Sequence, residues 1–94
     1  MKYRLYPNVV FERVCGTYLL IASGDALRSF DYVRVLNDTG GEILTMVSEG
    51  KDEEEVIHEI SLIYEMGEAG IRPGILGFID EMQTIGYLLP MKGE

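Results

Sequence analysis

The sequence predicts a single α+β domain of the winged helix-turn-helix type, in which a three-stranded antiparallel sheet precedes three helices. Up to residue 36 the apolar residues fall in short β-branched and aromatic runs, which are typical of strands. From residue 38 onward they recur at helical spacing. The segment Leu36–Leu44 marks the boundary between the two halves. Folds of this type commonly hold either nucleic acid or a peptide, and the remaining residues must decide between these uses.

The size and charge of the chain limit its class. Its 94 residues suffice for one domain, residues 1–94. The net charge of −8 would repel a phosphate backbone, because the eight basic residues are scattered along the sequence. No apolar run approaches the roughly 20 residues that a membrane helix needs, and Met1–Arg4 does not resemble a signal peptide. We therefore expect a cytoplasmic protein with neither nucleic acid nor membrane as a partner.

Three strands are expected before the boundary. The first runs from Val9 to Cys15, Gly16 supplies a bend, and the returning strand covers Thr17–Ala22. Residues 26–31 form a connection for which no structure is predicted. Tyr32–Leu36 is the third strand, with its side chains alternating between two faces. As the last strand of a meander, it would leave one edge open.

The first helix is predicted over residues 38–49. It can be capped by Asn37, or by Thr39 with Glu42 three residues later. Gly50 is a suitable C-terminal stop. Its expected apolar stripe consists of Ile43, Leu44, Met46 and Val47.

The second helix is predicted to begin at Asp52, with Glu55 in the capping-box position. Its expected buried stripe consists of Val56, Ile57, Ile60 and Ile63. Three glycines and a proline then predict a linker over residues 66–74.

The third helix is expected from Pro73 to Ile85, with Gly86 ending it. Ile75, Ile79 and Met82 fall on one face, and Phe78 and Ile85 lie beside that face. The helix is therefore apolar over a wide arc. Residues 87–89 are expected to return to the core.

No residue pattern indicates catalysis, a metal site or a cofactor. His58 lacks the partner of an HExxH motif and is expected to be an ordinary helix-surface histidine. Cys15, the single cysteine, excludes an intrachain disulfide and is expected to be a small buried residue. Gly40 and Gly41 match no nucleotide-binding pattern and are expected to permit tight packing. The acidic run 52–55 fits a helix start, where the helix dipole favours negative charge. We therefore expect a protein that is not an enzyme.

Two features are left unexplained: the open edge of the third strand and the wide apolar surface of the third helix. Side by side they would form a groove for an extended peptide, with backbone hydrogen bonds giving affinity and side-chain pockets giving selectivity. The alternative is that Phe78 and Ile85 merely complete the core.

Four motifs, in order, add a family resemblance. They are Leu36-Asn37-Asp38-Thr39-Gly40 before Ile43-Leu44, Cys15-Gly16-Thr17-Tyr18-Leu19-Leu20 before Gly24-Asp25-Ala26, Gly50 through Ile57, and Phe78-Ile79 with Met82 and Gly86-Tyr87-Leu88. Together they resemble the PqqD-like family, named for pyrroloquinoline-quinone synthesis protein D. The resemblance extends from about Val9 to Leu89.

The resemblance implies a peptide chaperone, also called a RiPP recognition element. Such proteins bind the leader of a ribosomally made precursor peptide by strand addition and deliver it to a modifying enzyme, often a radical-SAM protein. The leader would pair with Tyr32, Val33, Arg34 and Val35, while Ile75, Phe78, Met82 and Ile85 bound the groove, some of them as core residues. Arg28 and Arg34 are expected to pair with acidic leader side chains.

The chain departs from the family pattern before the third helix. The acidic, helix-favouring stretch of many relatives is replaced by Gly67, Gly70, Pro73 and Gly74, with Gly74 at a frequent aspartate position. Leu44 stands where a tryptophan or another large apolar residue is usual. These changes imply a different leader selectivity.

Three alternatives stay open at this point. A DNA-binding winged helix would use the third helix, which carries Asp80 and Glu81 and has only Arg72 at its entrance. An adaptor could dock on a protein without binding a leader. The open strand edge could also pair with its own copy to form a homodimer.

Overall fold

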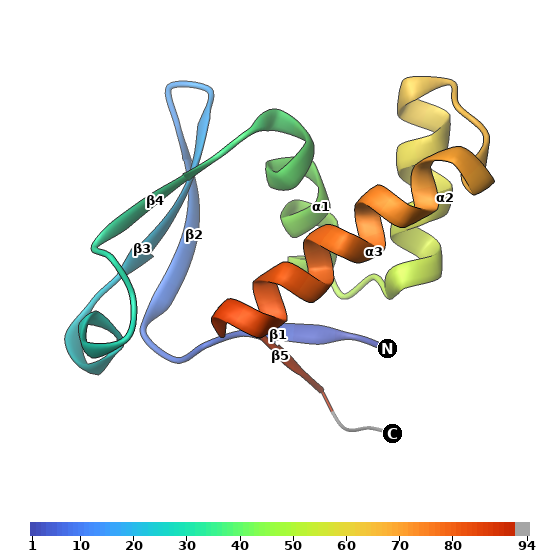
Figure 1. Cartoon of the computed structure of the whole chain (residues 1–94). Helices are drawn as coiled ribbons and strands as arrows, with labels where there is room; N and C mark the ends of the chain where they lie inside the picture. The colour runs from blue at the N-terminus through green and yellow to red at the C-terminus, as the bar shows by residue number, and fades with distance from the viewer. Residues whose placement is uncertain (92–94) are drawn as a thin grey trace.

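The computed structural model describes residues 1–91 and has the predicted order of a sheet followed by three helices (Figure 1). Its elements are β1 (Tyr3–Leu5), β2 (Val9–Val14), β3 (Thr17–Ala22), the short 3-10 helix η1 (Gly24–Arg28), β4 (Val33–Leu36), α1 (Asp38–Ser48), α2 (Glu53–Tyr64), α3 (Glu68–Ile85) and β5 (Leu88–Pro90). The three-stranded antiparallel sheet has the order β2-β3-β4, so the predicted fold class is confirmed. Among the described residues, no helix is both long and apolar enough to cross a bilayer.

The β2–β3 hairpin corrects the prediction for Cys15. A two-residue turn joins the strands, and both turn residues have positive φ, 51° at Cys15 and 80° at Gly16. This geometry matches the right-handed twist of the strands and places both residues at the tip of the hairpin. Cys15 is therefore exposed, and the expectation of a buried residue was wrong.

A second, two-stranded sheet joins the two ends of the described chain and was not predicted. β1 pairs antiparallel with β5, and the Met91 N–H donates to the Lys2 carbonyl at 2.8 Å. Each strand has only three residues, which is too short for an alternating pattern to be recognised. The expected return of the chain to the core after α3 is confirmed, because Tyr87 and Leu88 are buried.

Local sequence determines where α1 begins and how closely it packs. The Asn37 side chain accepts a hydrogen bond from the Gly40 N–H at 2.7 Å, which confirms the predicted cap. A Cβ atom at Gly41 would lie 2.1 Å from the Tyr18 ring, so only glycine lets α1 approach β3 this closely. The expected stripe of Ile43, Leu44, Met46 and Val47 is buried in full.

In α2 the predicted start is confirmed and the predicted stripe is too long. Asp52 and Glu55 form the reciprocal capping box. Val56, Ile57 and Ile60 are fully buried, but Ile63 is 53% exposed. Ile63 lies in the last turn of the helix, which extends past the surfaces that bury the preceding turns.

The predicted linker over residues 66–74 was wrong, because α3 begins at Glu68 and contains Pro73. An interior proline costs a helix about 3 kcal/mol, so contacts with α2 must stabilise this turn. The Arg72 guanidinium donates two hydrogen bonds of 2.8 Å to the Glu54 carboxylate, and His58 lies 2.8 Å from Glu68. These contacts outweigh the local preference of glycine and proline for a loop.

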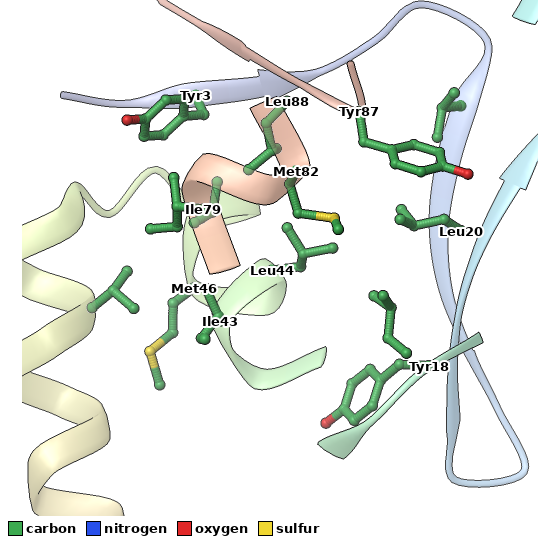
Figure 2. Close-up of a cluster of buried hydrophobic side chains, with 14 of the residues drawn as sticks. Tyr3, Tyr18, Leu20, Ile43, Leu44, Met46, Ile79, Met82, Tyr87 and Leu88 are labelled. Atoms are coloured by element: carbon green, nitrogen blue, oxygen red, sulfur yellow. The ribbon is translucent and has the colours of Figure 1, made fainter. Parts of the chain in front are cut away.

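One hydrophobic core joins the sheet to the helices. Figure 2 shows Leu20 of β3, Leu44 of α1 and Met82 of α3 converging, with Leu88 closing the cluster from the side of β5. Each of these four side chains is at most 2% exposed. The core thus holds α1 between the sheet and α3, which sets the distance between β4 and α3.

Candidate peptide-binding groove

The outer edge of β4 is unpaired among the described residues, because β4 is hydrogen-bonded to β3 alone. The Ala22 N–H donates to the Tyr32 carbonyl at 2.9 Å. Since hydrogen-bonded pairs alternate along an antiparallel ladder, Arg34 also bonds to β3, whereas Val33 and Val35 direct their N–H and C=O groups outward. Of the four residues predicted to pair with a peptide, these two valines offer free backbone groups.

The side chains of β4 alternate between solvent and the helices. Val33 and Val35 are 40% and 65% exposed, whereas Leu36 is buried. The Arg34 side chain lies on the same face as Leu36, and its guanidinium lies 5.9 Å from the centre of the Tyr87 ring. The inner face of the strand therefore presents a cation toward α3.

A hollow of about 310 Å³ lies between the start of α1 and α3. It is lined by Asn37, Thr39, Gly40, Ile43, Ile71, Gly74, Ile75, Phe78 and Glu81. Its walls are mostly apolar, and polar groups stand at the end of β4 and on α3. An extended peptide paired with β4 would turn alternate side chains toward this hollow.

Two glycines give the hollow its shape. A Cβ at Gly40 would lie 2.9 Å from the Phe78 ring, so that glycine lets the ring pack against the start of α1. A Cβ at Gly74 would meet no atom within 4 Å, so its absence leaves open space along α3. The departure from the family pattern at Gly74 therefore falls inside the hollow.

A weak ion pair crosses from β4 to α3. An Arg34 guanidinium nitrogen lies 3.9 Å from a Glu81 carboxylate oxygen, and both side chains are partly exposed. Exposed pairs of this kind contribute about 0–1 kcal/mol. Burial raises the pKa of the adjacent Tyr87 hydroxyl, and the positive charge of Arg34 opposes that rise. Glu81 thus already competes for the cation that was expected to contact an acidic leader residue.

The structure distributes the other predicted site residues unequally. Ile75 and Met82 are each 1% exposed and belong to the core, although Ile75 also forms part of the hollow's wall. Phe78 is partly buried and lines the hollow. Ile85 is 40% exposed and does not line it. Arg28, at the end of η1, is almost fully exposed and faces Asp25 at 4.0 Å.

Sequence reasoning missed two contributors from α3, Ile71 and Glu81. Ile71 continues the spacing of Ile75 and Ile79, so helical periodicity extended through the glycines could have found it. Glu81 was considered only as a charge unfavourable to DNA. Its proximity to Arg34 depends on the packing of α3 beside β4, which no local pattern encodes.

Comparisons with known proteins agree with this architecture. A family model described as coenzyme PQQ synthesis protein D (PqqD) matches residues 28–88, which span β4 and all three helices. None of the curated proteins matches the chain.

Two solved structures are similar in fold. One is a lasso peptide synthetase B1 complexed with the leader peptide, at 20% identity and a TM-score of 0.79 over 96% of this chain and 100% of that chain. The other is TbiB1 in complex with the TbiA(beta) leader peptide, at 18% identity and a TM-score of 0.79 over 99% of this chain and 100% of that chain.

Proposed function

This chain belongs to the PqqD family, and we propose that it binds the leader of a ribosomally synthesised precursor peptide and presents it to a modifying enzyme. The observation that carries the proposal is the open edge of β4 beside the apolar hollow on α3. Two proteins of the same fold have been solved with leader peptides, which supports the same class of ligand here.

In this proposal the leader adds to β4 as a further strand. The outward N–H and C=O groups of Val33 and Val35 bond to the leader backbone and contribute affinity. Alternate leader side chains enter the hollow, where Phe78 and Ile71 surround apolar groups. An acidic leader side chain exchanges with Glu81 for Arg34 and fixes the register of the strand.

The proposed role is binding and delivery, and the chemistry belongs to the partner enzyme. A radical-SAM protein is the partner that the family resemblance suggests. The acidic surface of α3 at Asp80 and Glu81 speaks against the DNA-binding alternative. An adaptor without a leader, or a homodimer joined through β4, would use the same edge and is separated from the proposal by the titration below.

The test is an NMR titration of isotope-labelled protein with the leader peptides encoded beside its gene. We expect shifts concentrated in residues 32–36 and in the part of α3 from Ile71 to Glu81. A Val35→Pro variant removes one outward N–H without removing a bond to β3, and it should bind at least about tenfold more weakly.

The matched control is Arg13→Pro. Arg13 lies on β2, the opposite edge of the sheet, so this variant should keep wild-type affinity for the leader. Saturating leader without any shift in residues 32–36 would refute the proposal. Self-association that disappears in Val35→Pro would instead favour the homodimer.

A further inference from the structure

The last turn of α2 exposes a group of large apolar side chains that the β4–α3 groove does not use. Leu62, Ile63 and Met66 are 64%, 53% and 52% exposed. None of them lines the hollow beside β4. Figure 1 shows α2 at the opposite end of the molecule from the three-stranded sheet. Single exposed apolar residues are ordinary, but adjoining ones commonly mark an interaction surface.

This apolar group lies within a strongly acidic half of the chain. Residues 38–71 carry ten acidic and one basic side chain, whereas residues 1–37 carry three acidic and five basic ones. The net charge of −8 is therefore concentrated on α1, α2 and the start of α3. A surface of one sign steers the encounter with a partner of the opposite sign.

A shallow hollow of about 180 Å³ between α1 and α2 connects the two properties. Its lining includes Glu42 and Glu49 of α1 and Glu59 of α2. Glu59 lies about one helical turn before Ile63, so both project from the same face of α2. The Tyr64 hydroxyl donates to the Glu42 carboxylate at 2.6 Å and fixes the end of α2 beside α1. Acidic and apolar groups thus form one continuous surface.

We propose that this surface, which consists of Leu62, Ile63, Met66, Glu42, Glu49 and Glu59 and is called the α2 face below, docks the modifying enzyme through a basic patch with an apolar centre. The inference rests on the proposed function, since the enzyme is the one that acts on the bound precursor. Apolar contact at the centre contributes affinity, and the acidic rim contributes steering and salt dependence.

Charge and position select this occupant over two others. A second copy of the chain, placed with the same face inward, would bring the acidic rims together, and like charges at an interface are costly. The leader has its own groove, and the α2 face lies outside it. Leader and enzyme can therefore be bound at the same time, as delivery requires.

The first experiment measures binding of the purified modifying enzyme encoded beside this chain's gene, with and without leader, by interferometry. The double variant Leu62→Ser/Ile63→Ser should weaken enzyme binding at least about tenfold, because central apolar contacts carry most of the energy of an interface. The matched control is Val10→Ser/Val14→Ser on β2, whose side chains are 48% and 49% exposed. That control should bind the enzyme as the wild type does.

The second experiment tests the charge. Glu42→Gln/Glu59→Gln should lower the association rate and flatten its dependence on salt, whereas Glu12→Gln on β2 should not. Leader affinity, measured separately, should stay within about twofold of wild type in every one of these variants.

The outcomes separate this inference from the proposed function. Loss of enzyme binding with intact leader binding supports the α2 face, and loss of leader binding alone bears only on the groove. Enzyme binding that is unaffected by both α2-face variants would overturn the inference. A wild-type dimer that dissociates in Leu62→Ser/Ile63→Ser would overturn it in favour of self-association.

Discussion

The three-stranded sheet has two open edges, and their surroundings differ. β4 borders the hollow formed by α1 and α3, whereas β2 borders a hollow of about 400 Å³ lined by Phe11, by β1 and by the C-terminal half of α1. The family model matches residues 28–88, which include every element around the first hollow and exclude β1 and β2. An open edge and an apolar hollow are thus not sufficient to assign a peptide site. The assignment to β4 depends on what accompanies them, namely Arg34, Glu81 and the family match.

The contact between α1 and β3 supports both edges, so breaking it should have the largest effect. In Gly41→Val, the new side chain would overlap the Tyr18 ring, because even a Cβ would lie 2.1 Å from it. Overpacking of this kind costs about 1–3 kcal/mol or more. Chemical denaturation should show a large loss of stability, and leader binding should weaken through unfolding. Gly77→Val, at a site with open space around the Cβ, is the control and should unfold near the wild-type midpoint.

Filling the β4-side hollow should separate stability from binding. Gly74→Leu places a side chain in the open space along α3 and replaces a helical glycine, which should stabilise the helix by about 0.5–1 kcal/mol. Leader affinity should nevertheless fall by about tenfold or more, since the side chain occupies the hollow. Gly77→Leu should gain similar stability without losing affinity, because Gly77 does not line the hollow. Equal affinity in the two variants would exclude the hollow as a binding pocket.

The charges across the β4-side groove should have an intermediate effect. Arg34→Glu puts two carboxylates side by side at Glu81 and should weaken leader binding several-fold while making it less sensitive to salt. Glu81→Gln frees Arg34 and should strengthen binding of an acidic leader. Calorimetry at two salt concentrations measures both changes. Unchanged binding in Arg34→Glu would remove Arg34 from the recognition site.

The smallest effect should come from the β2 side, where β1 is tied to α2. The Tyr3 hydroxyl donates to the Glu53 carboxylate at 2.5 Å, and burial, followed by Glu53, raises the pKa of Tyr3 to about 12. A raised folded pKa means that this stabilisation is complete below the unfolded value of about 10 and is lost as the pH rises toward 12.

Tyr3→Phe should therefore lower stability by about 1 kcal/mol at neutral pH and reduce its decline between pH 10 and 12. Urea titrations of both proteins across that range measure the difference. Leader affinity at neutral pH should not change, because Tyr3 belongs to the hollow beside β2. A loss of leader affinity would associate the peptide with the wrong edge.

The sequence predicted the features that are encoded locally. The cap at Asn37, the capping box at Asp52 and the stop at Gly86 were each recognisable within a few residues. The buried stripe of α1 and the edge position of β4 followed from periodicity and strand order. These features determine the fold class, and they bring the two walls of the groove together in outline.

The features that sequence reasoning missed depend on distant contacts. The first turn of α3 is helical because Arg72 bonds to Glu54, eighteen positions earlier, and a window of glycines and proline carries no sign of that pairing. The pairing of β1 with β5 joins the two ends of the described chain. The face of β4 that Arg34 occupies was likewise undetermined until α3 was placed beside it.

The central claim is that the leader adds to β4 rather than to β2, and amide hydrogen exchange tests it most directly. At β2 the Ser23 N–H bonds to the Asn8 carbonyl at 2.9 Å, so the same alternation directs the backbone groups of Phe11 and Arg13 outward. With saturating leader, the account predicts strong new protection of the Val33 and Val35 amides and none at Phe11 and Arg13. Protection that arises at Phe11 and Arg13, with Val33 and Val35 still exchanging freely, would contradict it.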